Sequence, residues 1–237
     1  MVTDASTNLE EALREGEIAV TGRLVAASNA TLLTKVVHGH MAVTCIYKPI
    51  AGERPLWDFP DGTLALREYA AYVLSTRCGF NVVPLTLLRD GPFGQGAVQL
   101  WVDIDETIDM LEFFQSDTSE LRNMALFDAV INNTDRKIGH ILPTTTGEVF
   151  GCDHGVAFHS EDKLRTVLWQ WAGKPFNEIE ISKLNSVAKY LQSPAELENL
   201  LTEEELSALI MRVDRLTSAG AFPQPSKGWP AVPWPPY

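Results

Sequence analysis

The chain has 237 residues, 45% of them hydrophobic and 21% charged, so it can bury the core of one large domain or of two lobes that share a cleft. No run of 18 or more apolar residues occurs, which excludes a membrane-spanning helix. The net charge of −12 repels the phosphates of nucleic acids and of anionic membranes, and so argues against both partners. It does not argue against a small anionic ligand in a locally basic pocket.

The N-terminal segment and the cysteines favour a cytoplasmic protein. Residues 1–16 are acidic and contain no apolar run, so we expect no secretory signal. Cys45, Cys78 and Cys152 each lie in an apolar context and do not form the pattern of a disulfide framework. We therefore expect buried thiols.

The first part of the chain predicts an antiparallel meander. A short acidic helix is expected near residues 7–15. Three runs rich in Val, Thr, Ile and Tyr follow, EIAVTGRLVAA (17–27), TLLTKVV (31–37) and MAVTCIYKPI (41–50). SNA and HGH separate these runs and are typical of turns.

A helix and two further strands complete this half. The loop AGERPLWDFPDGT (51–63) is interrupted by Pro and Gly, and LALREYAAYVLSTRCG (64–79) then has helical spacing of its apolar residues, with Gly79 as a stop signal. Residues 82–104 predict two strands joined by the Gly-rich turn RDGPFGQG.

From about residue 104 the pattern becomes helical. Helices are expected at 105–114, 118–133, 180–192 and 194–220. The segments NNTDRKIGHILP and GCDHG interrupt them as short strands or loops.

The last residues, FPQPSKGWPAVPWPPY (222–237), hold six Pro and two Trp and can be neither helix nor central strand. We expect an extended tail that packs its aromatic rings on the domain; the alternative is a polyproline-type ligand segment.

Lys48 and Glu68 are the first candidates for a functional site. Lys48 ends an otherwise apolar strand, and Glu68 lies on the helix that follows. A strand Lys and a helix Glu can pair, and such a pair holds the amine toward a phosphate. The alternative is an extended surface Lys and an exposed Glu.

A second set of candidates lies in the two interrupting segments. Asp135 follows a buried helix, with Arg136 beside it, and a loop Asp next to a cation stays ionised and accepts a hydrogen bond from a substrate hydroxyl. Asp153 has apolar flanks, an unfavourable place for a carboxylate unless it meets a metal or a cation. The alternatives are a turn residue for Asp153 and a partly buried polar residue for His140.

These motifs together resemble the phosphatidylinositol 3-/4-kinase-like superfamily, which includes the HipA-type kinases. Asp135-Arg136 matches the start of its Asp-Arg-x-x-x-Asn catalytic loop, and Asp153-His154-Gly155 matches its Asp-x-Gly metal motif. YKP at 47–49 and REYAAY at 67–72 resemble its Lys strand and Glu helix. The stretch GERPLWDFPDGTLALRE is also similar to that of a bacterial phosphatidylinositol-kinase-like family.

The resemblance implies an α+β, two-lobed protein-kinase-like fold. An antiparallel-sheet N-lobe with one helix (17–103) would follow an acidic segment (1–16), and a helical C-lobe (104–221) with the catalytic and metal loops would precede the tail (222–237).

The resemblance also implies a role for each candidate residue. Lys48, oriented by Glu68, would hold the phosphates of ATP; Asp153 would bind Mg²⁺; and Asp135, beside Arg136, would receive the acceptor hydroxyl. The remaining implied contacts are Ser28 and Asn29 in a phosphate-covering loop, Gln99, Trp101 and Val102 at an adenine hinge, and Lys163 and Arg165 for an anionic acceptor. His154 is expected to be a packing residue.

His140 departs from the family pattern because it occupies the place of the motif's Asn. Mg²⁺ prefers oxygen ligands, so an imidazole replaces an amide oxygen poorly. Either the second metal is lost, or a softer ion such as Mn²⁺ is used, or His140 binds through water.

Three functions remain open. The first is an ATP-dependent kinase whose acceptor is a protein or a soluble small molecule rather than a phosphoinositide, since no dense basic cluster occurs. The second is a nucleotide-binding pseudokinase that acts as an interaction module. The third and weakest is a cysteine or metal hydrolase built on Cys152, His154 and His159, which lacks an oxyanion hole and a suitable third ligand.

Overall fold

The computed structural model describes residues 3–24 and 29–237. Its contacts divide the chain into two compact units, which are described separately. We call Met1–Tyr69 with Pro84–Trp101 the sheet unit, and Ala70–Val83 with Val102–Tyr237 the helical unit. As domain boundaries, the limits expected after residues 16, 103 and 221 stay predictions.

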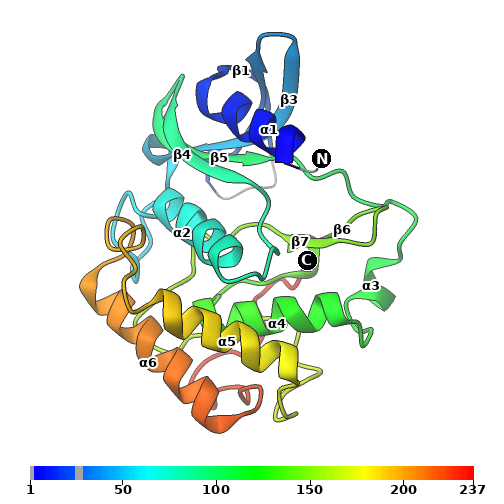
Figure 1. Cartoon of the computed structure of the whole chain (residues 1–237), viewed down its shortest axis with the longest axis vertical. Coiled ribbons are helices and arrows are strands. Elements are labelled where there is room, and N and C mark those ends of the chain that lie inside the picture. Colours follow the sequence, from blue (N-terminus) through cyan, green and yellow to red (C-terminus); the bar gives the residue numbers. More distant parts are fainter. Residues whose placement is uncertain (1–2, 25–28) are drawn as a thin grey trace. The chain divides into compact units, whose positions relative to one another are not determined.

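The sheet unit consists of helix α1 (Thr3–Glu15) and one five-stranded antiparallel sheet (Figure 1). Its strands are β1 (Glu17–Arg23), β2 (Leu32–His38), β3 (Met41–Pro49), β4 (Thr86–Gly91) and β5 (Gly94–Leu100), in the spatial order β1-β2-β3-β5-β4. The 3₁₀ turn η1 (Ile50–Gly52) follows β3. Helix α2 (Leu64–Arg77) then begins in this unit and ends in the other.

The core of the sheet unit lies between α1 and one face of the sheet. Leu13 of α1 packs with Val36, Cys45 and Val98, which are fully buried. Side chains of a strand alternate between its faces, so every second residue of a strand can point toward this core. Arg89 of β4 donates to the carbonyl oxygens of Leu13 and Gly16, at 2.6 and 2.9 Å, and so fixes the end of α1.

The helical unit begins with the last two turns of α2 and contains four further helices and a small hairpin (Figure 1). The elements are α3 (Met110–Phe113), α4 (Ser119–Ile131), the 3₁₀ turn η2 (Ile138–His140), β6 (Ile141–Pro143), β7 (Val149–Gly151), α5 (Glu178–Tyr190) and α6 (Glu203–Ala219). Most of α4 is buried, as its apolar sequence predicts.

Two expected helices are shorter than predicted, for local reasons. Residues 105–109 are not helical, because Asp105 accepts hydrogen bonds from the backbone and hydroxyl of Thr107, and α3 starts only after the cap Asp109. In the segment 194–220 the helix starts at residue 203, where Thr202 and Glu205 form a reciprocal capping box.

The predicted α+β class is confirmed, as is the succession of an antiparallel sheet and a mostly helical half that the resemblance to kinases implies. The tail packs against the helical unit, with Phe222 and Pro233 buried. Among the described residues, no helix has both the length and the apolar character needed to cross a membrane.

Candidate active site

Lys48 and Glu68 form the ion pair that the sequence predicts. Lys48 lies near the end of β3, and Glu68 lies one turn into α2. Lys48 Nζ is 2.5 Å from Glu68 Oε1, and the two side chains are 17% and 5% exposed. The carboxylate therefore fixes the direction of an amine that solvent still reaches.

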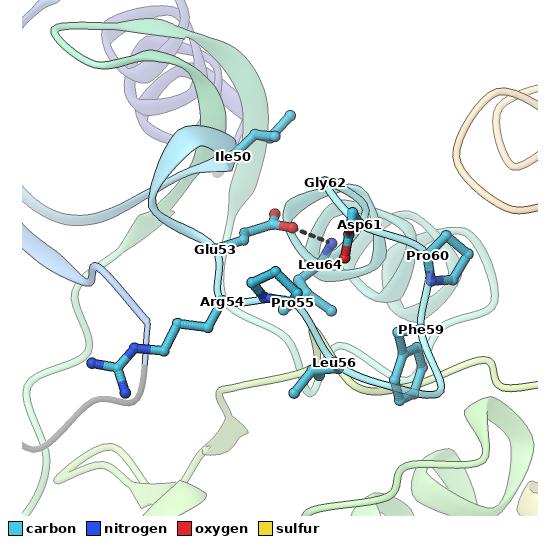
Figure 2. Close-up of a pocket in the computed structure, with 10 residues that line it drawn as sticks. All are labelled: Ile50, Glu53, Arg54, Pro55, Leu56, Phe59, Pro60, Asp61, Gly62 and Leu64. Atoms are coloured by element: carbon cyan, nitrogen blue, oxygen red, sulfur yellow. Dashed lines mark hydrogen bonds between the residues drawn. The ribbon is translucent and has the colours of Figure 1, made fainter.

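Glu53 holds the helix that carries Glu68. Its carboxylate accepts hydrogen bonds from the backbone N–H groups of Leu64, at 3.1 Å, and Ala65, at 2.8 Å (Figure 2). These N–H groups have no partner within the helix, and a negative charge at this end is favourable. Glu53 could not be recognised from the sequence. It caps the helix from eleven residues before Leu64, and no local capping motif marks it.

The loop around Glu53 encloses a cavity of about 220 Å³, lined mainly by apolar residues of the segment 50–64. Arg54 is one of the lining residues, and in Figure 2 its side chain points away from the others. Arg67 donates to the carbonyl of Thr63 at 3.2 Å and lies over the ring of Phe59 at 5.0 Å, which ties the loop to α2. The loop therefore acts as a support for α2, and its own carboxylate already occupies the helix terminus.

The structure describes only part of the expected phosphate-covering loop. Ser28 lies outside the described residues. Asn29 Oδ1 accepts a hydrogen bond from the backbone N–H of Arg54 at 2.9 Å, and the N–H of Ala30 donates to Gly52 at 3.1 Å. Asn29 thus ties this loop to the segment that supports α2.

The expected adenine hinge stays a prediction, and the structure shows which groups of its residues are already engaged. Gln99 is buried between β3 and β4, and its amide donates to Thr86 Oγ1 at 2.8 Å, so its side chain is committed within the sheet. The backbone N–H of Trp101 donates to Thr44 at 3.0 Å, while its ring is exposed. Val102 follows directly and is the first residue of the long segment of the helical unit.

In the helical unit, the loop after α4 is organised by Asn133. The helix ends at Asn132, which has a left-handed conformation with φ of 52°. Asn133 donates to Asp128 Oδ1 at 2.9 Å and accepts from the N–H of Asp135 at 3.0 Å. Asp135 thereby leaves the helix with its side chain 28% exposed, accessible to a substrate.

The cation that contacts the Asp135 carboxylate is Lys137, not Arg136. Lys137 Nζ lies 3.2 Å from Asp135 Oδ2. Arg136 is fully buried and pairs with Asp128, at 2.9 Å from Nη2 to Oδ1. Two consecutive cations thus point in opposite directions, and the expectation that Arg136 lies beside the Asp135 carboxylate is wrong.

Arg136 holds three segments of the helical unit together. Besides Asp128 of α4, its guanidinium donates to the carbonyl of His140 at 3.2 Å and to that of Cys152 at 3.0 Å. Its Nη2 is also 2.7 Å from His154 Nε2. A Cβ atom on Gly151 would lie only 2.8 Å from Arg136 Nη1, so a larger residue there would displace the guanidinium. Asp128 could have been recognised from the sequence, because an acid inside an apolar helix indicates a buried cationic partner such as Arg136.

His140 connects the loop of Asp135 to that of Asp153. Its Nδ1 is 2.9 Å from the carbonyl oxygen of Asp135, and its Nε2 is 3.3 Å from Asp153 Oδ2. A carbonyl only accepts, so Nδ1 carries the hydrogen, and in the neutral ring Nε2 presents a lone pair to a carboxylate. Burial lowers the pKa of His140, although the charge of Asp153 acts in the opposite direction.

The Asp153 backbone has φ of 58°, in the left-handed region that residues other than glycine rarely adopt. Such conformations concentrate at functional sites. A lone pair and a carboxylate facing each other form a donor set that fits a divalent cation with mixed nitrogen and oxygen ligands. Among the residues that the structure describes, no group of three or more His, Cys, Asp or Glu side chains could hold a metal ion.

Lys163 and Arg165 are turned inward. Lys163 is buried, with Nζ 3.1 Å from His159 Nε2 and 3.2 Å from Glu161 Oε2. Arg165 Nε donates to the carbonyl of Thr134 at 2.6 Å. Both cations also lie over the ring of Trp229, at 5.0 and 5.6 Å. These contacts tie both cations to the fold, and their expected role in binding an anionic acceptor stays a prediction.

The hydrolase hypothesis finds no support in the geometry. His154 is fully buried, contacts Arg136 and meets Phe127 edge-on at 6.1 Å, as expected of a packing residue. The two ring nitrogens of His159 face the N–H of Glu161 and the amine of Lys163. His154 is therefore engaged with Arg136, and His159 with Glu161 and Lys163.

No protein-family model matches the chain. The crystal structure of the Helicobacter pylori proinflammatory kinase CtkA superimposes with a TM-score of 0.48 and 12% identity, covering 88% of this chain and 93% of that chain. Protein Rv2133c of Mycobacterium tuberculosis is 42% identical, over 94% of this chain and 93% of its own length. The chain therefore belongs to the same family as Rv2133c.

Proposed function

We propose that this chain is an ATP-dependent phosphotransferase, an atypical kinase that transfers the γ-phosphoryl group to a hydroxyl of its acceptor. The proposal follows the resemblance to the phosphatidylinositol 3-/4-kinase-like superfamily. The observation that carries it is the arrangement of Asp135, His140 and Asp153, in which one imidazole bonds to the loop of the first acid and faces the carboxylate of the second.

The sheet unit would supply the phosphate-binding amine. Phosphoryl transfer depends on positioning and charge neutralisation more than on covalent chemistry. Lys48 would neutralise phosphate oxygens, and Glu68 would keep its amine in place, supported by the cap that Glu53 provides. Asn29, Trp101 and Val102 stay candidates for nucleotide contacts.

The helical unit would supply the acid–base and metal-binding groups. Asp135, partly exposed, would accept the proton of the acceptor hydroxyl. Asp153 and His140 would hold Mg²⁺ or Mn²⁺, with the remaining ligands from phosphate oxygens and water, as is usual for such ions. Such an ion would neutralise phosphate charge when bound, and the nitrogen donor of His140 would favour Mn²⁺. Arg136 is a positioning residue in this scheme, because its guanidinium holds the loops and does not reach solvent.

The acceptor is a protein or a soluble small molecule in this proposal. A phosphoinositide head group requires clustered cations, whereas the net charge is −12 and Lys163 and Arg165 are engaged within the fold.

The second candidate is a nucleotide-binding pseudokinase. It is favoured by His140, whose imidazole stands where the resemblance places an amide oxygen. Turnover distinguishes the two candidates, because both share Lys48 and Asp153.

The test is turnover of radiolabelled ATP and autophosphorylation in Mg²⁺ and in Mn²⁺. We expect Asp135→Ala to lower the rate by about 10²- to 10⁴-fold, the usual contribution of a general base. Glu148→Gln, an exposed acid in the β6–β7 hairpin, is the matched control and should keep the wild-type rate. Nucleotide binding without turnover in the wild type would establish the pseudokinase, and an Asp135→Ala variant of full activity would remove Asp135 from the reaction.

A further inference from the structure

The tail (Phe222–Tyr237), red in Figure 1, is fastened to the helical unit mainly through main-chain groups. The carbonyl oxygen of Ala231 accepts two hydrogen bonds, from the N–H of Thr166 at 3.1 Å and from Trp169 Nε1 at 2.8 Å. The carbonyl oxygen of Pro236 accepts from the N–H of Ile138 at 2.8 Å. A segment so rich in proline has few N–H groups, and here it contributes acceptors instead.

The segment 165–167 lies between the tail and the loop that carries Asp135. On the side of the loop, the N–H of Arg136 donates to Arg165 at 3.1 Å, and the N–H of Val167 donates to Arg136 at 3.1 Å. On the side of the tail, Thr166 donates to Ala231. The hydroxyl of Thr166 also lies 3.3 Å from Asp128 Oδ2, the carboxylate that binds Arg136. The tail therefore supports the loop that carries Asp135 through the segment 165–167.

Trp229 is the side-chain anchor of the tail. Its ring covers the charged ends of Lys163 and Arg165, and each contact lies within the range of a cation–π interaction. Trp234, five residues later, is 89% exposed. Two residues of the same type in one tail thus differ in their contacts, which provides a matched pair for experiment.

The bond from Ile138 to Pro236 acts close to the proposed catalytic groups. Ile138 begins the 3₁₀ turn η2, whose last residue is His140. The direction of this turn sets the direction of the imidazole, which bonds to the carbonyl of Asp135 and faces Asp153.

We infer that Trp229, Ala231 and Pro236 of the tail act as a positioning strap that holds the Asp135–His140 loop in the geometry needed for phosphoryl transfer. The catalytic consequence rests on the proposed function; the positioning of His140 does not. The docked tail fixes the loop through Ile138 and Thr166, and Trp229 keeps the tail docked.

The test compares Trp229→Ala with the matched control Trp234→Ala in the full chain. Hydrogen exchange of the amides of Ile138 and Thr166 reports docking, and the imidazole nitrogen NMR signals of His140, assigned with His140→Gln, report its position. In Trp229→Ala we expect at least tenfold faster exchange at both amides and shifted His140 signals. Trp234→Ala should match the wild type. Trp229→Phe should keep most of the wild-type amide protection and the wild-type His140 signals, because it retains an aromatic face.

Steady-state kinetics give the catalytic readout. We expect kcat to fall at least tenfold in Trp229→Ala, because the loop that carries Asp135 and His140 loses its support. Unchanged exchange, or faster exchange with unshifted His140 signals and unchanged kcat, would overturn the inference. If the wild type does not turn over ATP, the proposed function fails, and the His140 signals alone then decide the positioning claim. Should the alanine variant not fold, Trp229→Leu replaces it.

Discussion

Two ion pairs, one in each unit, differ in their access to water. Lys48–Glu68 in the sheet unit keeps an amine that is 17% exposed, whereas both side chains of Arg136–Asp128 in the helical unit are fully buried. An amine in contact with solvent can take an anionic ligand as an additional partner. A guanidinium whose bonds all go to the protein can only hold the protein in shape. Lys48 is therefore the group that we propose for ligand binding, whereas Arg136 holds the loops around it in position.

The two pairs also differ in how they are supported. Glu68 depends on the placement of one helix, which Glu53 caps. Arg136 belongs to a network of a carboxylate, main-chain carbonyls and the ring of His154. Buried networks of this kind are stable only while every member has its partner.

Breaking the buried pair should have the largest effect. Asp128→Ala leaves the charge of Arg136 without its carboxylate in a dry site, and we expect a loss of about 3–5 kcal/mol in the free energy of unfolding. Glu68→Gln should cost less, about 1–2 kcal/mol, because Lys48 can turn toward water. Urea unfolding measures both variants.

The control for these variants is Glu196→Gln, in the exposed pair with Arg77, where about 0–1 kcal/mol is expected. Equal losses in the free energy of unfolding for Asp128→Ala and Glu196→Gln would contradict the distinction between the buried Arg136–Asp128 pair and the exposed pair.

Removing the cap of α2 should have an intermediate effect. Glu53→Gln replaces one of two accepting oxygens and removes a negative charge from the helix N-terminus, so we expect a loss of about 1 kcal/mol. Asp61→Asn, an exposed acid of the same loop, should leave thermal and urea unfolding unchanged. If the cap contributes nothing to stability, Glu53→Gln and Asp61→Asn will give indistinguishable unfolding curves.

The smallest effect concerns pH and His140. Its pKa is lowered in the folded protein by burial, so the unfolded chain binds the proton more readily. Stability should therefore be fully present above the ordinary histidine pKa of about 6.5 and should fall as the pH drops through it. Urea unfolding at pH 7.5 and pH 5.5, without divalent metal, should show a steeper loss for the wild type than for His140→Gln. Identical pH dependence would remove His140 as a source of this loss.

Much of the sheet unit follows from its sequence, because alternation along β2, with Thr34 and Val36 buried, sets which side chains face the core. The pairing of Lys48 with Glu68 could be predicted for a similar reason, since a strand end and the next helix are close along the chain. The false extension of a helix over residues 105–109 arose because the turn at Asp105 depends on its side chain rather than on apolar spacing.

The helical unit shows why the rest could not be predicted. Arg136 and Lys137 are neighbours of equal charge, and nothing local decides which of them turns inward. The backbone of Arg136 pairs with Thr166, thirty residues later, and this long-range contact directs its side chain toward Asp128.

The most direct test of the account is calorimetric titration of a non-hydrolysable ATP analogue with Mn²⁺ into the wild type, Lys48→Met and Lys35→Met. Lys35 is an exposed lysine on β2 and provides the matched loss of charge. The account predicts that Lys48→Met weakens binding at least about tenfold, or about 1.4 kcal/mol, while Lys35→Met binds as the wild type does. Equal binding by all three proteins would contradict it.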